Sequence, residues 1–181
     1  MTITSRSASS DPPRALAVVV MGVAGAGKTT VGLKLAEALR GQFVDGDDLH
    51  TEEACAKMGR GRPLTDEDRW PWFDRIAAAL SDGVRHGVTT VAASSALRRV
   101  HRDRLRQRAG AGLRFVYLKA DRDMMRARVA SRRGHYIPAS LVDSQFATLE
   151  PPDGGRNVIV IPADKDLGAA IPKLAAELKG R

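Results

Sequence analysis

A glycine-rich segment near the start of the chain has the residue types of a loop that binds phosphate. Residues 22–29 read GVAGAGKT and match G-x-x-x-x-G-K-[ST], between a predicted strand and a predicted helix. Glycines let backbone N–H groups turn toward phosphate oxygens, and the helix that follows directs its positive end at them. Lys28 would reach the β- and γ-phosphates, and the Thr29 hydroxyl would be a ligand of Mg²⁺. A glycine turn without a ligand is the alternative, which the number of matched positions disfavours. The residues expected to bind the nucleotide, ATP, are Gly22, Val23, Ala24, Gly25, Ala26, Gly27, Lys28, Thr29 and Thr30.

Acidic residues follow the next predicted strand, in the segment DGDDLH at residues 45–50. Ligands of open parallel sheets bind at the carboxyl ends of the strands, so these carboxylates should lie near the γ-phosphate. In an extended chain, Asp45 and Asp47 point to the same side. One carboxylate can hold Mg²⁺ through water, and the other can accept a proton from an attacking hydroxyl. We assign Asp45 to the metal, Asp47 to the proton and His50 to a substrate hydroxyl. An ordinary Asp-Gly turn and a histidine without a ligand are the alternatives.

The elements that must position these residues alternate along the chain. Apolar, β-branched runs typical of buried strands occur at residues 15–21, 42–45, 88–94, 113–119 and 157–161. Helical patterns occur near residues 28–40, 66–86, 97–108, 121–133, 138–149 and 167–179. This β-α-β order predicts an α/β fold, with a parallel sheet, right-handed crossovers and helices on both faces. Thr65 and Asp68 resemble a capping box at the start of the helix expected near 66–86. Pro71 is also compatible with a start several residues later.

Length and composition bound the class of protein. The chain has 181 residues, which suits one domain at 15–181 after a Ser- and Pro-rich segment, 1–14, that we expect to be disordered. No apolar run approaches the roughly 20 residues of a membrane span, and the run at 15–21 is too short for a signal peptide. A single cysteine excludes an intrachain disulfide and favours a reducing, cytoplasmic compartment.

The chain is also basic, with a formal net charge of +8. This excess predicts an anionic partner, which could be nucleic acid, an acidic lipid surface or a small phosphorylated or carboxylated molecule. The 29 basic residues are 22 arginines and 7 lysines, and many arginines fall in two clusters, at 98–108 and 126–135. In the first cluster, Arg98, Arg102 and Arg106 share one helical face, whereas we expect Arg104 and Arg108 to face solvent.

Further motifs make the chain resemble the gluconate kinases. In order along residues 17–152 they are DGDxLH (45–50), KM (57–58), GxPLxDxDRxPW (61–72), SALR (95–98), RDxLR (102–106), YLK (117–119), RxxxRxGHY (128–136) and SQFxTL (144–149). The most specific part is 45–72, because the glycine-rich loop alone would indicate only the wider group that includes shikimate and nucleoside-monophosphate kinases. The resemblance implies a three-layer P-loop kinase fold with a five-stranded parallel sheet and a mobile lid, about 126–140, and often a homodimer.

The implied reaction is the ATP-dependent phosphorylation of D-gluconate at its terminal hydroxyl, giving 6-phospho-D-gluconate. Gluconate differs from a neutral sugar by its carboxylate, which the guanidinium groups of Arg69, Arg98 and Arg102 could bind through paired hydrogen bonds. Within the resemblance, Arg128 would lie against the adenine or the phosphates. Arg132 would be the lid arginine that neutralises transition-state charge, and His135 would be a further substrate ligand. Solvated basic helices are the alternative for both clusters.

The chain departs from the family pattern at several positions. Ala54 stands where the family usually has Asn, Thr51 where Pro follows the histidine, and His101 where an aromatic residue precedes Arg102. Ser94 replaces a usual cysteine, and arginines replace lysines at 98 and 99. The missing Asn removes a possible contact to a sugar hydroxyl, so the preference among sugar acids stays open.

Three other functions remain as alternatives. A kinase of another small carboxylated metabolite, such as a shikimate-type enzyme, would share the loop and the Asp-x-Asp pair. A basic, ATP-dependent nucleic-acid-binding protein would use the arginine clusters on phosphates, but neither cluster has interleaved aromatic residues. A relative that only binds ATP is disfavoured by the intact Lys28, Thr29, Asp45 and Asp47. We therefore expect small-molecule partners, gluconate and ATP, and no nucleic acid or membrane.

Overall fold

The computed structural model describes residues 14–60, 62–131, 139–155, 157–164 and 166–180. In this part of the chain, five parallel strands form one sheet in the order β2-β3-β1-β4-β5. The strands are β1 (Ala17–Met21), β2 (Gln42–Asp45), β3 (Thr90–Ser94), β4 (Arg114–Lys119) and β5 (Val158–Pro162). Because Met21 pairs with Ser94, β1 and β3 end level with each other. The loops that leave these two strands therefore start side by side at the carboxyl edge of the sheet.

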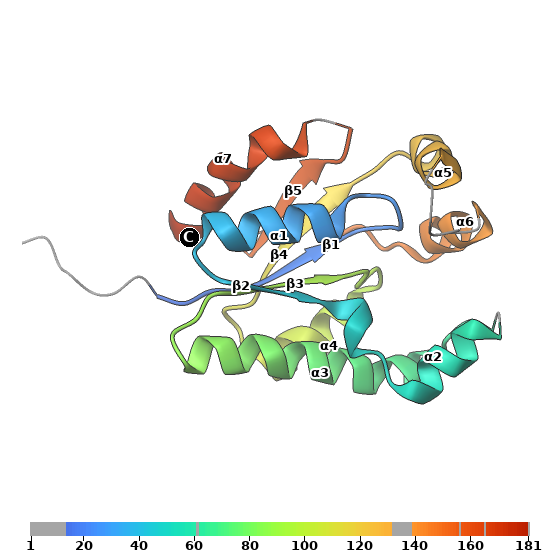
Figure 1. Ribbon diagram of the computed structural model, residues 1–181, viewed down its shortest axis with the longest axis horizontal. Helices are drawn as coiled ribbons and strands as arrows, with labels where there is room; N and C mark the ends of the chain where they lie inside the picture. The colour runs from blue at the N-terminus through green and yellow to red at the C-terminus, as the bar shows by residue number, and fades with distance from the viewer. Residues whose placement is uncertain (1–13, 61, 132–138, 156, 165, 181) are drawn as a thin grey trace, which may run out of the picture.

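Helices cover both faces of the sheet (Figure 1). The α-helices are α1 (Lys28–Ala38), α2 (Glu52–Gly59), α3 (Asp66–Arg85), α4 (Arg99–Ala109), α5 (Arg122–Ser131), α6 (Ala139–Thr148) and α7 (Leu167–Gly180). One face carries α1 and α7, and the opposite face carries α3 and α4. The helices α5 and α6 pack together beyond the carboxyl edge, on the side where the β1–α1 loop lies.

Strand β1 shows how the sequence produces two cores. Its five side chains are all buried, and they alternate between the faces of the sheet. Val18 and Val20 join the core that includes Leu35 of α1 and Leu174 of α7. Val19 and Met21 join the second core, which includes Phe73 of α3. A strand covered on both faces needs a continuous apolar run, which is the pattern seen at its position in the sequence.

The expected sheet and helices are confirmed, with two short elements added. The chain turns from β2 into a 3₁₀ helix, η1 (Gly46–Leu49), and then into α2, which the sequence did not reveal because both are short and weakly apolar. Thr51 caps α2 by accepting a hydrogen bond from the backbone N–H of Ala54 at 3.1 Å. Residues 132–138 of the expected lid segment and the tail 1–13 lie outside the described residues.

Helix α3 begins at Asp66 with the predicted capping box. Thr65 accepts from the backbone N–H of Asp68, and the Asp68 carboxylate accepts from the backbone N–H of Thr65 at 2.7 Å. Pro71 lies inside this helix, where it removes one backbone hydrogen bond. The helix continues past the proline because its next turns bury large side chains against the sheet, including Trp72, Phe73 and Ile76. No helix among the residues that the structure describes is long and apolar enough to cross a membrane.

Candidate active site at the carboxyl edge of the sheet

The β1–α1 loop has the backbone geometry that a phosphate cradle needs. Gly25 and Gly27 have φ angles of 82° and 93°, in the left-handed region that favours glycine. Gly27 is the N-cap of α1, so the positive end of that helix faces the loop. A Cβ atom at Gly25 would lie 3.1 Å from a methyl group of Val129, which shows how closely α5 approaches the loop. Lys28 Nζ donates to the carbonyl of Val23 at 3.1 Å and closes the loop on itself.

The structure brings the two predicted metal ligands together. Thr29 lies in the first turn of α1 and Asp45 ends β2, yet the Thr29 hydroxyl donates to Asp45 Oδ2 at 3.1 Å. The other carboxylate oxygen of Asp45 accepts from the backbone N–H of Asp47 at 3.1 Å and caps η1. A hydroxyl and a carboxylate oxygen are thus held side by side at the mouth of the loop. Thr30, the next residue expected to contact the nucleotide, is exposed in the same helical turn.

Asp45 and Asp47 do not lie in one extended segment, as we had expected. The strand ends at Asp45, and Asp47 belongs to η1, so the alternation of an extended chain no longer applies. Its side chain is 84% exposed, whereas Asp45 turns toward Thr29. This corrects the geometry that we expected but leaves the Asp47 carboxylate accessible at the carboxyl edge.

His50 is held between an aromatic ring and an acid. Its ring stacks on Trp72, with 4.2 Å between centroids and 15° between planes. Its Nε2 lies 4.0 Å from Asp47 Oδ1, and its buried Nδ1 has no hydrogen-bond partner among the described residues. Burial lowers the pKa of His50, with Asp47 opposing the shift, so the imidazole favours the neutral form. Trp72 also donates from Nε1 to the carbonyl of Gly46, which ties η1 to α3.

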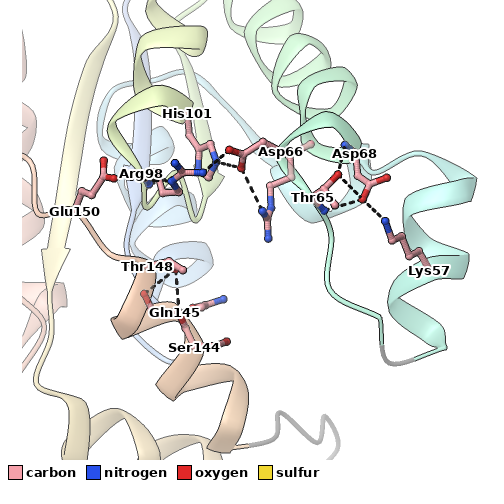
Figure 2. A network of polar contacts seen from close by, with 11 residues as sticks. Lys57, Thr65, Asp66, Asp68, Arg98, His101, Ser144, Gln145, Thr148 and Glu150 are labelled. Atoms are coloured by element: carbon pink, nitrogen blue, oxygen red, sulfur yellow. Dashed lines mark hydrogen bonds and ion pairs between the residues drawn. The ribbon is translucent and has the colours of Figure 1, made fainter.

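Asp66 contacts two of the three arginines that we expected to bind a carboxylate, and Figure 2 shows Arg98 beside it. Arg98 donates to Asp66 Oδ2, and Arg69 lies 3.6 Å from Asp66 Oδ1. A hydrogen bond from His101 is the largest cause that lowers the pKa of Asp66, and the bond from Arg98 adds to it. Asp66 is therefore an ionised internal partner that orients both guanidinium groups. The sequence placed Asp66 in a motif but did not predict this role.

His101 occupies the position where the family usually has an aromatic residue, and it retains the ring contacts. It lies 4.8 Å from Phe73 and 6.0 Å from Trp70, measured between ring centroids. Its Nε2 donates to Asp66 Oδ1 at 3.0 Å, while Nδ1 accepts from the backbone N–H of Arg98 at 3.4 Å. Burial lowers the pKa of His101, which favours this neutral tautomer. His101 thus adds a hydrogen bond to the site without losing the aromatic packing.

The guanidinium group of Arg102 does not lie where a ligand of the substrate carboxylate was expected. Its side chain is buried, with 4% of its surface exposed, and its guanidinium donates to the carbonyls of Ala96 and Leu97 at 3.1 and 2.8 Å. Ala96 has a φ of 40°, an uncommon value for a residue other than glycine. We therefore reassign Arg102 from binding a substrate to holding the β3–α4 loop, residues 95–98.

The remaining arginines of α4 bind neighbouring side chains. Arg104 was expected to face solvent, but it forms a bidentate pair with Asp74 of α3 at 2.7 and 2.6 Å. Arg108 is exposed as expected, with its Nε 3.5 Å from Asp74. Arg106 donates to Asp103 at 2.9 Å. Periodicity predicted a shared face for Arg98, Arg102 and Arg106, but it did not predict the acids that the arginines of α4 contact.

In the second arginine cluster, the structure describes Arg128 but not Arg132 or His135, which lie outside the described residues. Arg128 donates to the carbonyl of Ala163 at 2.9 Å. Ala163 follows β5, and its backbone N–H donates to the carbonyl of Lys119 at the end of β4. Arg128, which the resemblance places against the adenine or the phosphates, therefore contacts the loop that follows β5.

The chain is similar to known proteins over most of its length. A model of the AAA domain family matches residues 18–152. A probable gluconokinase of Rattus norvegicus is 39% identical over 176 residues, covering 88% of this chain and 93% of the relative. The thermosensitive gluconokinase of Escherichia coli K12 is 39% identical over 142 residues, covering 78% and 75%. The crystal structure of a gluconokinase from Sinorhizobium meliloti 1021 superposes with a TM-score of 0.77 at 40% identity, covering 91% and 92%.

The chain belongs to the gluconokinase family. Its five described parallel strands and the helices on both faces are the P-loop kinase fold of that family. The resemblance seen in the sequence is thereby confirmed, and the protein is an ATP-dependent carbohydrate kinase. Several features that shape the gluconokinase site could not be found from the sequence. They are the Asp66 cluster, the contact between Trp72 and Gly46, and a hydrogen bond from Ala24 to Gln145.

Proposed function

We propose that the protein transfers the γ-phosphoryl group of ATP to the terminal hydroxyl of D-gluconate, giving 6-phospho-D-gluconate. The observation that carries this proposal is the contact between Thr29 and Asp45, with the exposed Asp47 carboxylate two residues further on. This contact joins the start of α1 to the end of β2, and the Asp47 carboxylate that follows is accessible to a substrate hydroxyl. The named relatives, a probable gluconokinase and a thermosensitive gluconokinase, support gluconate as the acceptor.

In the proposed reaction, the chain positions two ligands and moves one proton. The backbone N–H groups of the β1–α1 loop and Lys28 hold the phosphates of ATP. The terminal hydroxyl oxygen of gluconate forms a bond to the γ-phosphorus as the bond to the bridging oxygen of ADP breaks. Asp47 orients this hydroxyl and accepts its proton. Arg132, the proposed lid arginine, and Arg128, near the loop after β5, complete the cationic surroundings.

The residues at the mouth of the loop fit Mg²⁺. Among the residues that the structure describes, no three histidine, cysteine or acidic side chains gather as a metal-binding group. Mg²⁺ in kinases needs no such group, because it takes one or two protein ligands together with substrate phosphates and water. We propose that the Thr29 hydroxyl and Asp45 Oδ2, which lie 3.1 Å apart, would hold the ion. When bound, it would neutralise charge on the phosphates.

The carboxylate of gluconate would lie against Arg98 and Arg69. The Arg98 side chain is 38% exposed, so it can meet a ligand while Asp66 orients it. Arg98→Ala should therefore raise KM for gluconate by about 10-fold or more, the cost of losing a charged hydrogen bond, and leave KM for ATP within about twofold. Steady-state kinetics with each substrate varied in turn would measure this.

Arg108→Ala is the matched control, because Arg108 is exposed at the far end of the same helix. It should leave both KM values near those of the wild type. Equal increases in the two KM values for Arg98→Ala would contradict carboxylate binding by this residue.

A coupled assay of ADP release across a panel of sugar acids and shikimate tests the proposed function directly. We expect the highest kcat/KM with gluconate. Ala54 is buried and lacks the hydrogen-bonding side chain that the family usually has there, so other sugar acids are the informative competitors. Higher kcat/KM with shikimate, or ADP release that no acid stimulates, would contradict the proposal.

We further propose that the protein acts in the cytoplasm, possesses no nucleic-acid partner and forms a homodimer. The contacts of the arginines support the absence of a nucleic-acid partner. Arg98 and Arg69 lie at Asp66, Arg104 and Arg108 at Asp74, and Arg102 at backbone carbonyls. Many of the arginines that make the chain basic thus bind carboxylates or carbonyls of the chain itself.

A further inference from the structure

Helix α6 and the residues that follow it contact the loops on both sides of the proposed reaction centre. One contact is to the β1–α1 loop, which would hold ATP, and the other is to the β3–α4 loop, residues 95–98, which carries Arg98. Figure 2 shows Gln145 on α6 and Glu150 beyond its end, next to Arg98. Nothing in the proposed mechanism uses either side chain.

The first contact fixes a backbone group of the phosphate-binding loop. Ala24 donates from its backbone N–H to Gln145 Oε1 at 2.6 Å, across 121 positions of sequence. Ala24 is 8% exposed and precedes Gly25, one of the two glycines whose left-handed backbone shapes the loop. A buried N–H group without a partner is costly, so this hydrogen bond stabilises the loop in its present form.

The second contact fixes the start of α4. The backbone N–H of Glu150 donates to the carbonyl of Leu97 at 3.1 Å, and its carboxylate accepts from the backbone N–H of Arg99 at 2.5 Å. The same carboxylate lies 3.9 Å from Arg98 Nε. Arg102 holds this loop from inside the protein, and Glu150 holds it from the side of α6.

The segment between the two contacts is packed against the protein. Val142 of α6 is fully buried in the core under α1 and α7, and Phe146 packs against that core. Leu149 contacts both cores. Close-packed elements move as units, so a displacement of one loop would be passed through α6 and the residues after it to the other loop.

We propose that α6 couples the phosphate-binding loop to the β3–α4 loop, with Gln145 and Glu150 as positioning residues, so that each substrate strengthens binding of the other. The identity of the second ligand as a sugar acid rests on the proposed function. The coupling between the loops does not, because the nucleotide alone can test it.

The first experiment measures amide hydrogen exchange of residues 97–99 with and without a non-hydrolysable ATP analogue. In the wild type the analogue should slow this exchange by about 3- to 10-fold, the range expected for strengthening one hydrogen-bonded contact. Gln145→Met keeps the length of the side chain but removes the strong acceptor, so the slowing should disappear. Gln107→Met, at an exposed position of α4, is the matched control and should retain it. Persistent slowing in Gln145→Met, or no slowing in the wild type, would overturn the proposal.

The second experiment measures Kd of the analogue with and without gluconate. The ratio of the two values should exceed about 3 in the wild type and fall toward 1 in Gln145→Met and in Glu150→Ala. The Glu150 side chain is 51% exposed, so its loss should not prevent folding. A merely structural role would lower Tm and leave the ratio unchanged, which would refute the coupling. If gluconate neither reacts nor alters Kd in the wild type, the proposed function fails, and the exchange experiment still decides the coupling.

Discussion

Lys28→Ala is expected to lower kcat by about 100-fold or more, because it removes a positive charge that stabilises the transferring phosphoryl group. Lys28 opens α1, immediately after the N-cap Gly27, and its Nζ is held toward the β1–α1 loop by the carbonyl of Val23. Binding of phosphates would bring the ammonium group to the β- and γ-oxygens, where charge develops during transfer. The effect should therefore be larger on kcat than on KM for gluconate.

Initial rates from a coupled assay would measure both constants. Lys34→Ala is a suitable control, since Lys34 is exposed further along the same helix and bears the same charge. It should retain nearly normal turnover. A kcat for Lys28→Ala within a few-fold of the wild type would show that the loop does not hold a reacting nucleotide.

Asp47→Asn should also lower kcat by about 100-fold or more, with little change in either KM, because asparagine cannot accept the proton of the attacking hydroxyl. The substitution conserves shape, and the hydrogen bond between Asp45 and residue 47 uses the backbone N–H, so η1 should persist. The loss would thus report on proton transfer and not on folding.

Asp48→Asn provides the matched control, because Asp48 is exposed in the same 3₁₀ turn. Its kcat should remain close to that of the wild type. Near-normal turnover in Asp47→Asn would exclude Asp47 as the base. A comparable loss in both variants would instead point to a general effect of charge at this turn.

The sequence pattern predicted an element correctly where the interactions that form it lie between residues close in sequence. The run at 15–21 predicted a buried strand, and β1 occupies Ala17–Met21, because a strand that is covered on both faces is built mainly from apolar residues. The capping box at Thr65 depends on atoms three residues apart and was found where the sequence placed it. The expectation of an extended segment from Asp45 to Asp47 was wrong, because β2 ends at Asp45 and Asp47 belongs to the 3₁₀ helix η1.

The partners of the charged side chains could not be predicted in the same way. The spacing of Arg98, Arg102 and Arg106 indicated a shared face but could not separate a ligand-facing guanidinium from a buried one. Arg98 meets Asp66 across 32 positions, whereas Arg102 turns into the loop that precedes its own helix. Whether an arginine binds a carboxylate, a backbone carbonyl or solvent depends on the helix packed opposite it, and that packing is not encoded in local periodicity.

The sequence by itself determined the alternation of the five strands with the longer helices, the phosphate-binding loop and the acidic end of β2, since each depends on residue type and short spacing. Only the tertiary structure decided that Thr29 meets Asp45, that Asp66 and His101 orient Arg98, and that Gln145 holds Ala24. Each of these contacts joins different elements of the fold. Which atoms meet in these contacts depends on how the helices pack against the sheet. A small shift of one helix would give a polar side chain a different hydrogen-bond partner.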